Sequence, residues 1–121
     1  MNKSLSLLLE PNEIQAVNSF VERLLELYPA RIRRTVLFGS KARGDSSTWS
    51  DIDILIVADS EDWRFQHAIS TLAARVSLEY DVVIGPRVVG QARWERMKRH
   101  QFSLYRNVIS EGIPLPFPVR S

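Results

Sequence analysis

Residues 51–57, with the sequence DIDILIV, constrain the fold more than any other stretch of this chain. Apolar side chains alternate along the segment as in a β-strand, and its isoleucines are directed to one face. Asp51 and Asp53 share the opposite face, although aspartate is a poor strand former and an unpaired buried carboxylate is costly. A chain that keeps two carboxylates in such a strand is expected to give them a partner.

The segments before this strand predict a helix and a second strand. Residues 11–28 carry apolar side chains at helical spacing, with Pro11 in the first turn and Pro29 just beyond the end. Residues 34–39 predict a short strand that stops at a glycine. A single helical turn can begin at Ser40, inside the polar connection to the next strand.

The segments after it continue the alternation of helices and strands, which predicts an α/β or α+β domain with a small sheet. A helix follows the acidic residues 59–62 and is expected to bury Phe65, Ile69, Leu72 and Val76, and a third strand over 80–85 is closed by Pro86. Next come a basic helix over 90–99 around Trp94 and Met97 and a helix over 101–111 with one apolar face, formed by Phe102, Tyr105, Val108 and Ile109. An extended tail over 113–121 is expected to end the chain.

Composition excludes several classes of function. The chain has 121 residues, enough for one domain, and its formal net charge of +2 is too small to argue for nucleic acid by itself. It has no cysteine, so disulfides, thiolate metal sites and thiol catalysis are excluded. The apolar run near the N-terminus is too short for a signal peptide, and no stretch approaches a membrane span, so we expect a cytoplasmic protein.

The paired carboxylates predict a metal site. Side chains at positions i and i+2 of a strand project from one face, where like charges raise one pKa unless a cation lies between them. A Mg²⁺ ion suits such a pair, because it takes carboxylate oxygens together with the phosphate oxygens of a bound nucleotide. The competing interpretation is two strand-end aspartates that face water, so the pair alone does not establish the site.

The residues between the two strands favour the metal. Gly39 ends the first strand where a backbone can approach a ligand closely. A helical turn from Ser40 would direct N–H groups at an anion, and Lys41 and Arg43 add positive charge near a phosphate. Phosphate-binding groups are therefore predicted at the end of one strand and metal-binding groups at the start of the next.

Residues 39–57, GSKARGDSSTWSDIDILIV, resemble the signature of the nucleotidyltransferase superfamily that includes DNA polymerase β. That signature is G-S-x-A-R-G, five residues, then S-D-x-D and an apolar strand. The chain is most similar to the minimal, stand-alone members. The resemblance implies a nucleotidyltransferase fold with a small mixed sheet flanked by helices, one domain over residues 1–121, a nucleoside triphosphate substrate and Mg²⁺.

The resemblance also implies roles for individual residues. Gly39 and Ser40 match the pair that contacts the β- and γ-phosphates, and Asp51 and Asp53 match metal ligands. Lys41 stands where the family often has arginine, which keeps the charge but loses the bidentate fork. The full set predicted to bind the nucleotide is Gly39, Ser40, Lys41, Arg43 and Ser50.

A third carboxylate is expected on a later strand, where in the family it ligates metal and often serves as the base for the attacking hydroxyl. Asp81 fits this role, and Glu79, with the same strand parity, is the alternative. Trp49 is bulkier than the usual residue before the S-D-x-D motif, and covering the sheet edge suits it better than stacking on a base.

The resemblance to antitoxins encoded beside a helical HEPN-type toxin predicts the acceptor. The chain would transfer AMP from ATP to a hydroxyl of that partner protein. Because 121 residues build only the nucleotide half of a larger transferase, the acceptor is a protein, is small, or binds across a homo-oligomer.

Two other functions are weighed against this one. The chain could be a non-catalytic module that neutralises a partner by contact, using the basic segment over residues 87–106. That segment suits an acidic protein or a nucleic acid backbone, with nucleic acid less favoured. The chain could also modify a small molecule such as an aminoglycoside, although a basic segment suits a cationic substrate poorly.

Overall fold

The computed structural model describes residues 5–45 and 50–115, and the four strands in this part form one sheet. In chain order the elements are α1 (Leu5–Leu8), α2 (Pro11–Leu27), β1 (Ile32–Phe38), α3 (Ser40–Arg43), β2 (Ile52–Ala58), α4 (Trp63–Tyr80), β3 (Ile84–Gly90), α5 (Gln91–Arg99), α6 (Ser103–Glu111) and β4 (Ile113–Pro114). The mixed α/β architecture that the sequence predicts is confirmed.

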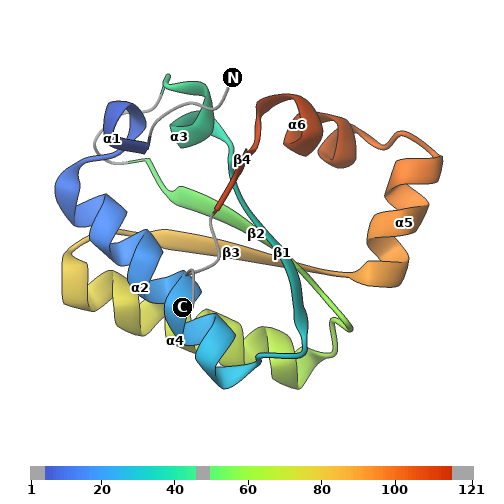
Figure 1. Ribbon diagram of the computed structural model, residues 1–121, viewed down its shortest axis with the longest axis horizontal. Helices are drawn as coiled ribbons and strands as arrows, with labels where there is room; N and C mark the ends of the chain where they lie inside the picture. The colour runs from blue at the N-terminus through green and yellow to red at the C-terminus, as the bar shows by residue number, and fades with distance from the viewer. Residues whose placement is uncertain (1–4, 46–49, 116–121) are drawn as a thin grey trace, which may run out of the picture.

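The sheet has the strand order β3-β2-β1-β4 (Figure 1). Strand β1 pairs antiparallel with both β2 and β4, whereas β2 and β3 are parallel and are joined by the crossover helix α4. The start of β2 therefore lies beside the end of β1 and the start of β3. This corner of the sheet is where the sequence places its carboxylates.

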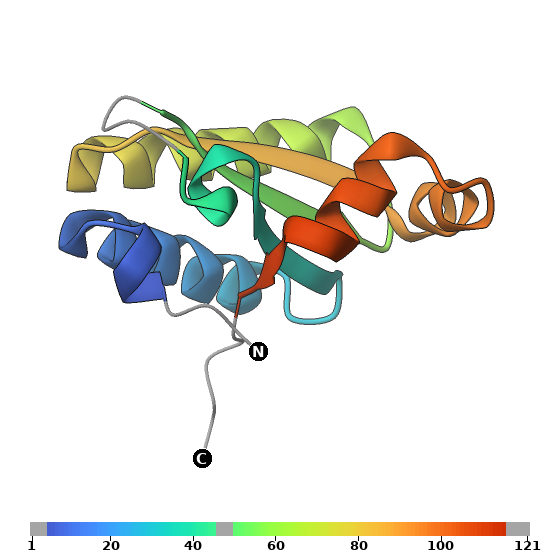
Figure 2. The ribbon, with the colours of Figure 1, turned by 90° about the horizontal axis from the view of Figure 1, so that it is seen from above.

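The two faces of β2 pack against different helices, as the alternation of its side chains predicts. Ile52, Ile54 and Ile56 belong to a core shared with α2 and α4. Leu55 and Val57 belong to a second core, which α5 and α6 complete with residues such as Trp94, Met97 and Val108. Figure 2 shows α2 and α4 running alongside each other, with α5 at the far end of the molecule and α6 reaching back from it toward β1.

Helix α2 begins with a reciprocal cap. Pro11 occupies the first turn, the Glu10 side chain accepts from the backbone of Glu13, and the Glu10 N–H donates to Glu13 Oε1 at 2.8 Å. Of the predicted apolar stripe, Val17, Val21 and Leu24 are buried, whereas Ile14, Leu25 and Tyr28 are partly buried against the same core. The helix ends before Pro29. The stripe on α4, with Phe65, Ile69, Leu72 and Val76, is buried as predicted.

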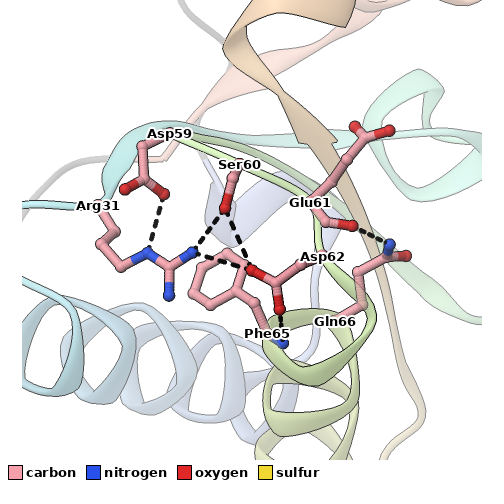
Figure 3. Close-up of polar contacts among 7 residues, drawn as sticks. All are labelled: Arg31, Asp59, Ser60, Glu61, Asp62, Phe65 and Gln66. Atoms are coloured by element: carbon pink, nitrogen blue, oxygen red, sulfur yellow. Dashed lines mark hydrogen bonds and ion pairs between the residues drawn. The ribbon is translucent and has the colours of Figure 1, made fainter.

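The end of β2 opposite the carboxylates is closed by the polar network of Figure 3. The guanidinium of Arg31 donates to Asp59 and Ser60 at 2.8 Å each and lies 3.8 Å from the ring centroid of Phe65. Asp62 caps α4, because its Oδ1 accepts from the Phe65 N–H at 3.0 Å. The network fixes the start of α4 against the entry to β1.

The third strand differs from the prediction. Helix α4 runs on to Tyr80, so β3 covers Ile84–Gly90 rather than residues 80–85. Pro86 lies inside the strand instead of closing it. An edge strand tolerates proline because the missing N–H can lie on the unpaired side, and β3 is paired only with β2.

Helix α6 departs from the prediction on one point. Val108 is buried and Tyr105 packs beside it, but Phe102 and Ile109 are 51% and 53% exposed. The helix thus leaves two large apolar side chains uncovered. Beyond it, β4 pairs with β1, and the rest of the tail predicted to be extended, residues 116–121, lies outside the described residues. None of the described helices is long and apolar enough to cross a membrane.

Candidate active site

Asp51 and Asp53 lie at the start of β2, on the same side of the sheet as Gly85 of β3. Asp53 is aligned with Gly85 across the parallel pair, and Asp51 directly precedes the strand. A Cβ built on Gly85 would lie 3.3 Å from Asp53 Oδ1 and 3.8 Å from Asp51 Oδ2. Both carboxylates therefore border one point in space, as the i, i+2 spacing predicts.

Gly39 borders the same carboxylate from the other side. It follows Phe38, which is aligned with Asp53 across β1 and β2, and a Cβ on Gly39 would overlap Asp53 Oδ2. Its φ of +76° also favours glycine. Because Gly39 and Gly85 lack a side chain, the backbone passes close to the Asp53 carboxylate on both flanks.

The environment of Asp53 disfavours its charge. Burial raises the pKa of Asp53 above its ordinary value, the nearby Asp51 carboxylate raises it further, and Arg43 opposes both effects. A carboxylate held in this way gains from a cation beside it. The raised pKa of Asp53 therefore agrees with a site built for a positive ion.

The four residues of α3 divide between the core and the site. Ala42 and Lys41 are buried, whereas Ser40 and Arg43 are partly or fully exposed. The helical turn explains the division, because residues three apart share a face while Lys41 lies on the far side. Lys41 Nζ lies 2.8 Å from Glu13 Oε2 on α2, so the prediction that Lys41 adds charge beside a phosphate is not supported.

Arg43 is the cation that the fold brings to the carboxylates. Its guanidinium donates to Asp45 Oδ2 at 3.1 Å and to Glu111 Oε2, at the end of α6, at 3.4 Å. The guanidinium also lowers the pKa of Asp53, although burial and Asp51 outweigh it. Arg43 can therefore hold an anionic group that sits over the carboxylate pair.

Asp81 does not occupy the predicted place on a strand. It caps the C-terminus of α4 with φ 56° and ψ 50°, since the helix includes Tyr80 and β3 begins only at Ile84, four residues after the predicted start. Two residues later, the Val83 carbonyl accepts from the Ile52 N–H at 2.8 Å, so Asp81 remains at the same corner of the sheet. Its role as third metal ligand and base stays a prediction.

Glu79, the alternative to Asp81, does not fit the role of third carboxylate, because its side chain is directed to α2. Glu79 lies on α4 and pairs with Arg23 of α2 at 2.7 Å, and this partner lowers the pKa of Glu79. Within residues 5–45 and 50–115, no three histidine or carboxylate side chains are close enough together to hold a metal. The carboxylate donors that the fold does supply are the pair Asp51 and Asp53.

A two-carboxylate site fits Mg²⁺. This ion is held in proteins by one or two carboxylates, with water and substrate phosphates completing its shell. Gly39 and Gly85 hold the Asp53 carboxylate closely, and Asp51 lies on the same side of the sheet to share an ion with it. Ser50, next to the pair, is partly buried, whereas Trp49 lies outside the described residues.

Three residues of this corner were not anticipated from the sequence. Gly85 and Glu111 become neighbours of the site only through the pairing of β3 and the course of α6. Glu13 looked like a first-turn acidic residue of α2, and nothing in its spacing shows that it turns inward to Lys41. The glycine-proline pair at 85 and 86 was the one available hint, because a glycine in a strand often marks a close approach.

The basic segment forms a separate surface. Its exposed cations are Arg87, Arg96, Lys98, Arg99 and Arg106, and none of them makes an ion pair with another described residue. Arg93 is the exception, at 3.4 Å from Glu61. On this basic surface Phe102 stacks with His100, with ring centroids 5.8 Å apart.

Comparison with known sequences gives one family. The model of the family described as nucleotidyltransferase domain matches residues 17–114. Two proteins of Methanocaldococcus jannaschii, each named putative protein adenylyltransferase, are similar to the chain. One is 42% identical over 84% of this chain and 95% of its own length. The other is 35% identical over 60% of this chain and 75% of its own length.

Solved structures agree with the fold. A structure described as a putative minimal nucleotidyltransferase is 25% identical, with a TM-score of 0.50 over 84% of this chain and 95% of that one. Two mutants of the toxin-antitoxin MntA-HpeT match with TM-scores of 0.51 and 0.54 at 24% and 21% identity. They cover 89% and 88% of this chain and 72% of each matched chain, and they support the fold alone.

Proposed function

The chain belongs to the nucleotidyltransferase domain family, and from this premise we propose that it transfers AMP from ATP to a hydroxyl group of a partner protein. The observation that carries the proposal is the pair Asp51 and Asp53, which face one point between two glycines at the corner of the sheet. A pair of strand-end aspartates facing water would have no need of that clearance.

The proposed reaction assigns roles to four groups: the aspartate pair, Arg43, the Gly39–Ser40 turn and Asp81. Asp51 and Asp53 would hold Mg²⁺, which stabilises charge on the reacting phosphate. Arg43 holds the negatively charged triphosphate, and the Gly39–Ser40 turn approaches it closely. A bond forms from the acceptor oxygen to the α-phosphorus, the bond from that phosphorus to the β-phosphate oxygen breaks, and pyrophosphate leaves. The hydroxyl proton passes to a base, the role predicted for Asp81.

Two lines of support favour a protein as acceptor. The relative that covers 84% of this chain is named a putative protein adenylyltransferase, and the two toxin-antitoxin structures share the fold of this chain. The exposed Phe102 and Ile109 on α6, with unpaired cations nearby, also suit a protein surface that carries carboxylates. A HEPN-type toxin is the partner that we propose.

The test is a label-transfer assay. The protein is incubated with α-labelled ATP, Mg²⁺ and the product of the adjacent gene, and label on that product is followed on a gel. D53N is the matched inactive variant, and chelation of Mg²⁺ gives a second control. Label on the partner with wild type alone supports the proposal, whereas its absence from every candidate acceptor contradicts it.

A second function is favoured by the α6 surface. The chain would neutralise the partner by contact alone, through Phe102, Ile109 and the neighbouring cations. D53A separates the two functions, because it removes a metal ligand and leaves α6 untouched. If D53A still neutralises the partner in growth assays, contact is sufficient; if neutralisation is lost while binding persists, chemistry is required.

A further inference from the structure

The pair Glu13–Lys41 joins α2 to the turn that would hold the nucleotide. Lys41 Nζ lies 2.8 Å from Glu13 Oε2, and the two side chains are 4% and 9% exposed. Lys41 immediately follows Gly39 and Ser40, so its side chain connects the turn to the interior of the protein.

Both oxygens of Glu13 are engaged. Oε2 faces Lys41, while Oε1 accepts the Glu10 N–H at 2.8 Å as part of the cap of α2. A carboxylate fixed at both oxygens has little rotamer freedom, so it defines one position for the ammonium group. Because Glu13 lies in the first turn of α2, the ammonium group is held against a 17-residue helix, which is a rigid support.

Helix α3 needs such a support. It has four residues, and a helix of one turn does not persist on its own because nucleation is unfavourable. Its internal hydrogen bonds are few: the N–H of Arg43 donates to Gly39 at 3.1 Å, and the N–H of Gly44 donates to Ser40 at 3.0 Å. The buried Ala42 and Lys41 are its anchors to the core.

Stability alone does not explain an ionic anchor. Apolar residues of similar volume usually serve a buried position as well or better, since removing two charges from water is expensive. An ion pair does add one thing, which is a defined register between the two groups it joins. We propose that Glu13 is a positioning residue, which acts through Lys41 to hold the Gly39–Ser40 turn and Arg43 in register with Asp53 for the nucleotide.

This inference rests on the proposed function, and its test uses Mg²⁺·ATP as the probe. The main variant is E13Q/K41M, which removes both charges, keeps similar volumes and leaves no buried charge unpaired. The single variants E13Q and K41M each strand one buried charge and are expected to be less stable. The control is R23Q, which breaks a different ion pair of α2, the exposed one with Glu79.

Binding is measured by calorimetry at a temperature where circular dichroism shows every variant to be folded. We expect the ATP dissociation constant of E13Q/K41M to rise about tenfold, since small misplacements of a binding group are costly. R23Q should bind ATP like wild type. K41R, which keeps the ion pair with Glu13, should retain most of the wild-type affinity for ATP. Amide exchange at Arg43 and Gly44 should accelerate in E13Q/K41M and not in R23Q.

The possible failures are distinguishable. A wild type that does not bind Mg²⁺·ATP overturns the proposed function and this inference with it. If wild type binds Mg²⁺·ATP and a folded E13Q/K41M binds it equally well with unchanged amide exchange, this inference alone is overturned. The pair Glu13–Lys41 is then only a structural contact.

Discussion

Gly39 lies so close to Asp53 that a Cβ on the glycine would overlap the Asp53 carboxylate. The two residues come from the end of β1 and the start of β2, and the antiparallel register brings them together. The two halves of the sequence motif are therefore one site, joined through a clearance that only glycine provides.

G39A tests the clearance. Alanine must displace the Asp53 carboxylate and adopt a backbone with φ +76° and ψ −157°, a region that is essentially restricted to glycine. We expect loss of nucleotidyl transfer by about 10²-fold, because the metal ligand moves. G44A is the control, since Gly44 also has positive φ but its Cβ would meet only Leu8. Equal losses of transfer in G39A and G44A would contradict the prediction.

D53N tests the electrostatics of the pair through the pH dependence of stability. The folded pKa of Asp53 is raised, so between its unfolded value of about 3.9 and the folded value the folded state binds more protons. The stability contributed by Asp53 therefore falls as pH rises through this window. In metal-free buffer, D53N should match wild type near pH 3 and melt several degrees higher at pH 7.

The measurement is thermal melting of both proteins across this pH range, with and without Mg²⁺. The depressed pKa values of Asp59 and Asp62 affect both proteins alike and cancel in the comparison. With Mg²⁺·ATP present, wild type should gain stability and D53N should not. A D53N that is less stable than wild type at neutral pH without metal would show that the Asp53 charge is already compensated.

R43A tests the cation of the site. Without the guanidinium, the triphosphate loses its cationic partner, and we expect KM for ATP to rise about tenfold or more, as for a charge-assisted bond. E111Q should change KM by less than about threefold, because the pair with Arg43 is exposed and weak. Steady-state kinetics at varied ATP distinguish the two. A larger effect of E111Q than of R43A would reverse the assignment.

D81N tests the third carboxylate separately from the pair. Asparagine tolerates the left-handed backbone of this helix cap, so the fold should be unchanged. Because Asp81 lies outside a metal-binding cluster, we expect D81N to bind Mg²⁺·ATP within about twofold of wild type, unlike D53N. Retained binding with lost transfer would make Asp81 the base, whereas lost binding would show that it is a ligand.

D62A tests the network at the opposite end of β2. It removes the cap of α4 and should lower the free energy of unfolding by about 1 kcal/mol, as N-cap deletions do. D62N should keep most of the stability, since asparagine also caps helices. Transfer per folded molecule should be unchanged, because the cap lies far along β2 from Asp53. Denaturant unfolding and the label assay check both statements, and a loss of transfer in D62A would show long-range coupling.

Local patterns were sufficient for most elements. The helices α2 and α4 have long periodic stripes and recognisable caps, and β2 shows its two faces in every second residue. The predictions of secondary structure were wrong where tertiary contacts outweighed the local preference of the sequence. Helix α4 includes Tyr80, so β3 begins four residues later than predicted, and the edge position of β3 accommodates Pro86.

The sequence by itself determined that Asp51 and Asp53 share one face of a strand and that a glycine ends the strand before it. The residue spacing fixes both, because the strand repeat is two and the left-handed backbone favours glycine. Only the tertiary structure decided which cation lies near the Asp53 carboxylate. Lys41 and Arg43 are two residues apart on one helical turn, so one turns to Glu13 in the core and the other to the carboxylates. That choice depends on where α2 and α6 pack, which no local pattern records.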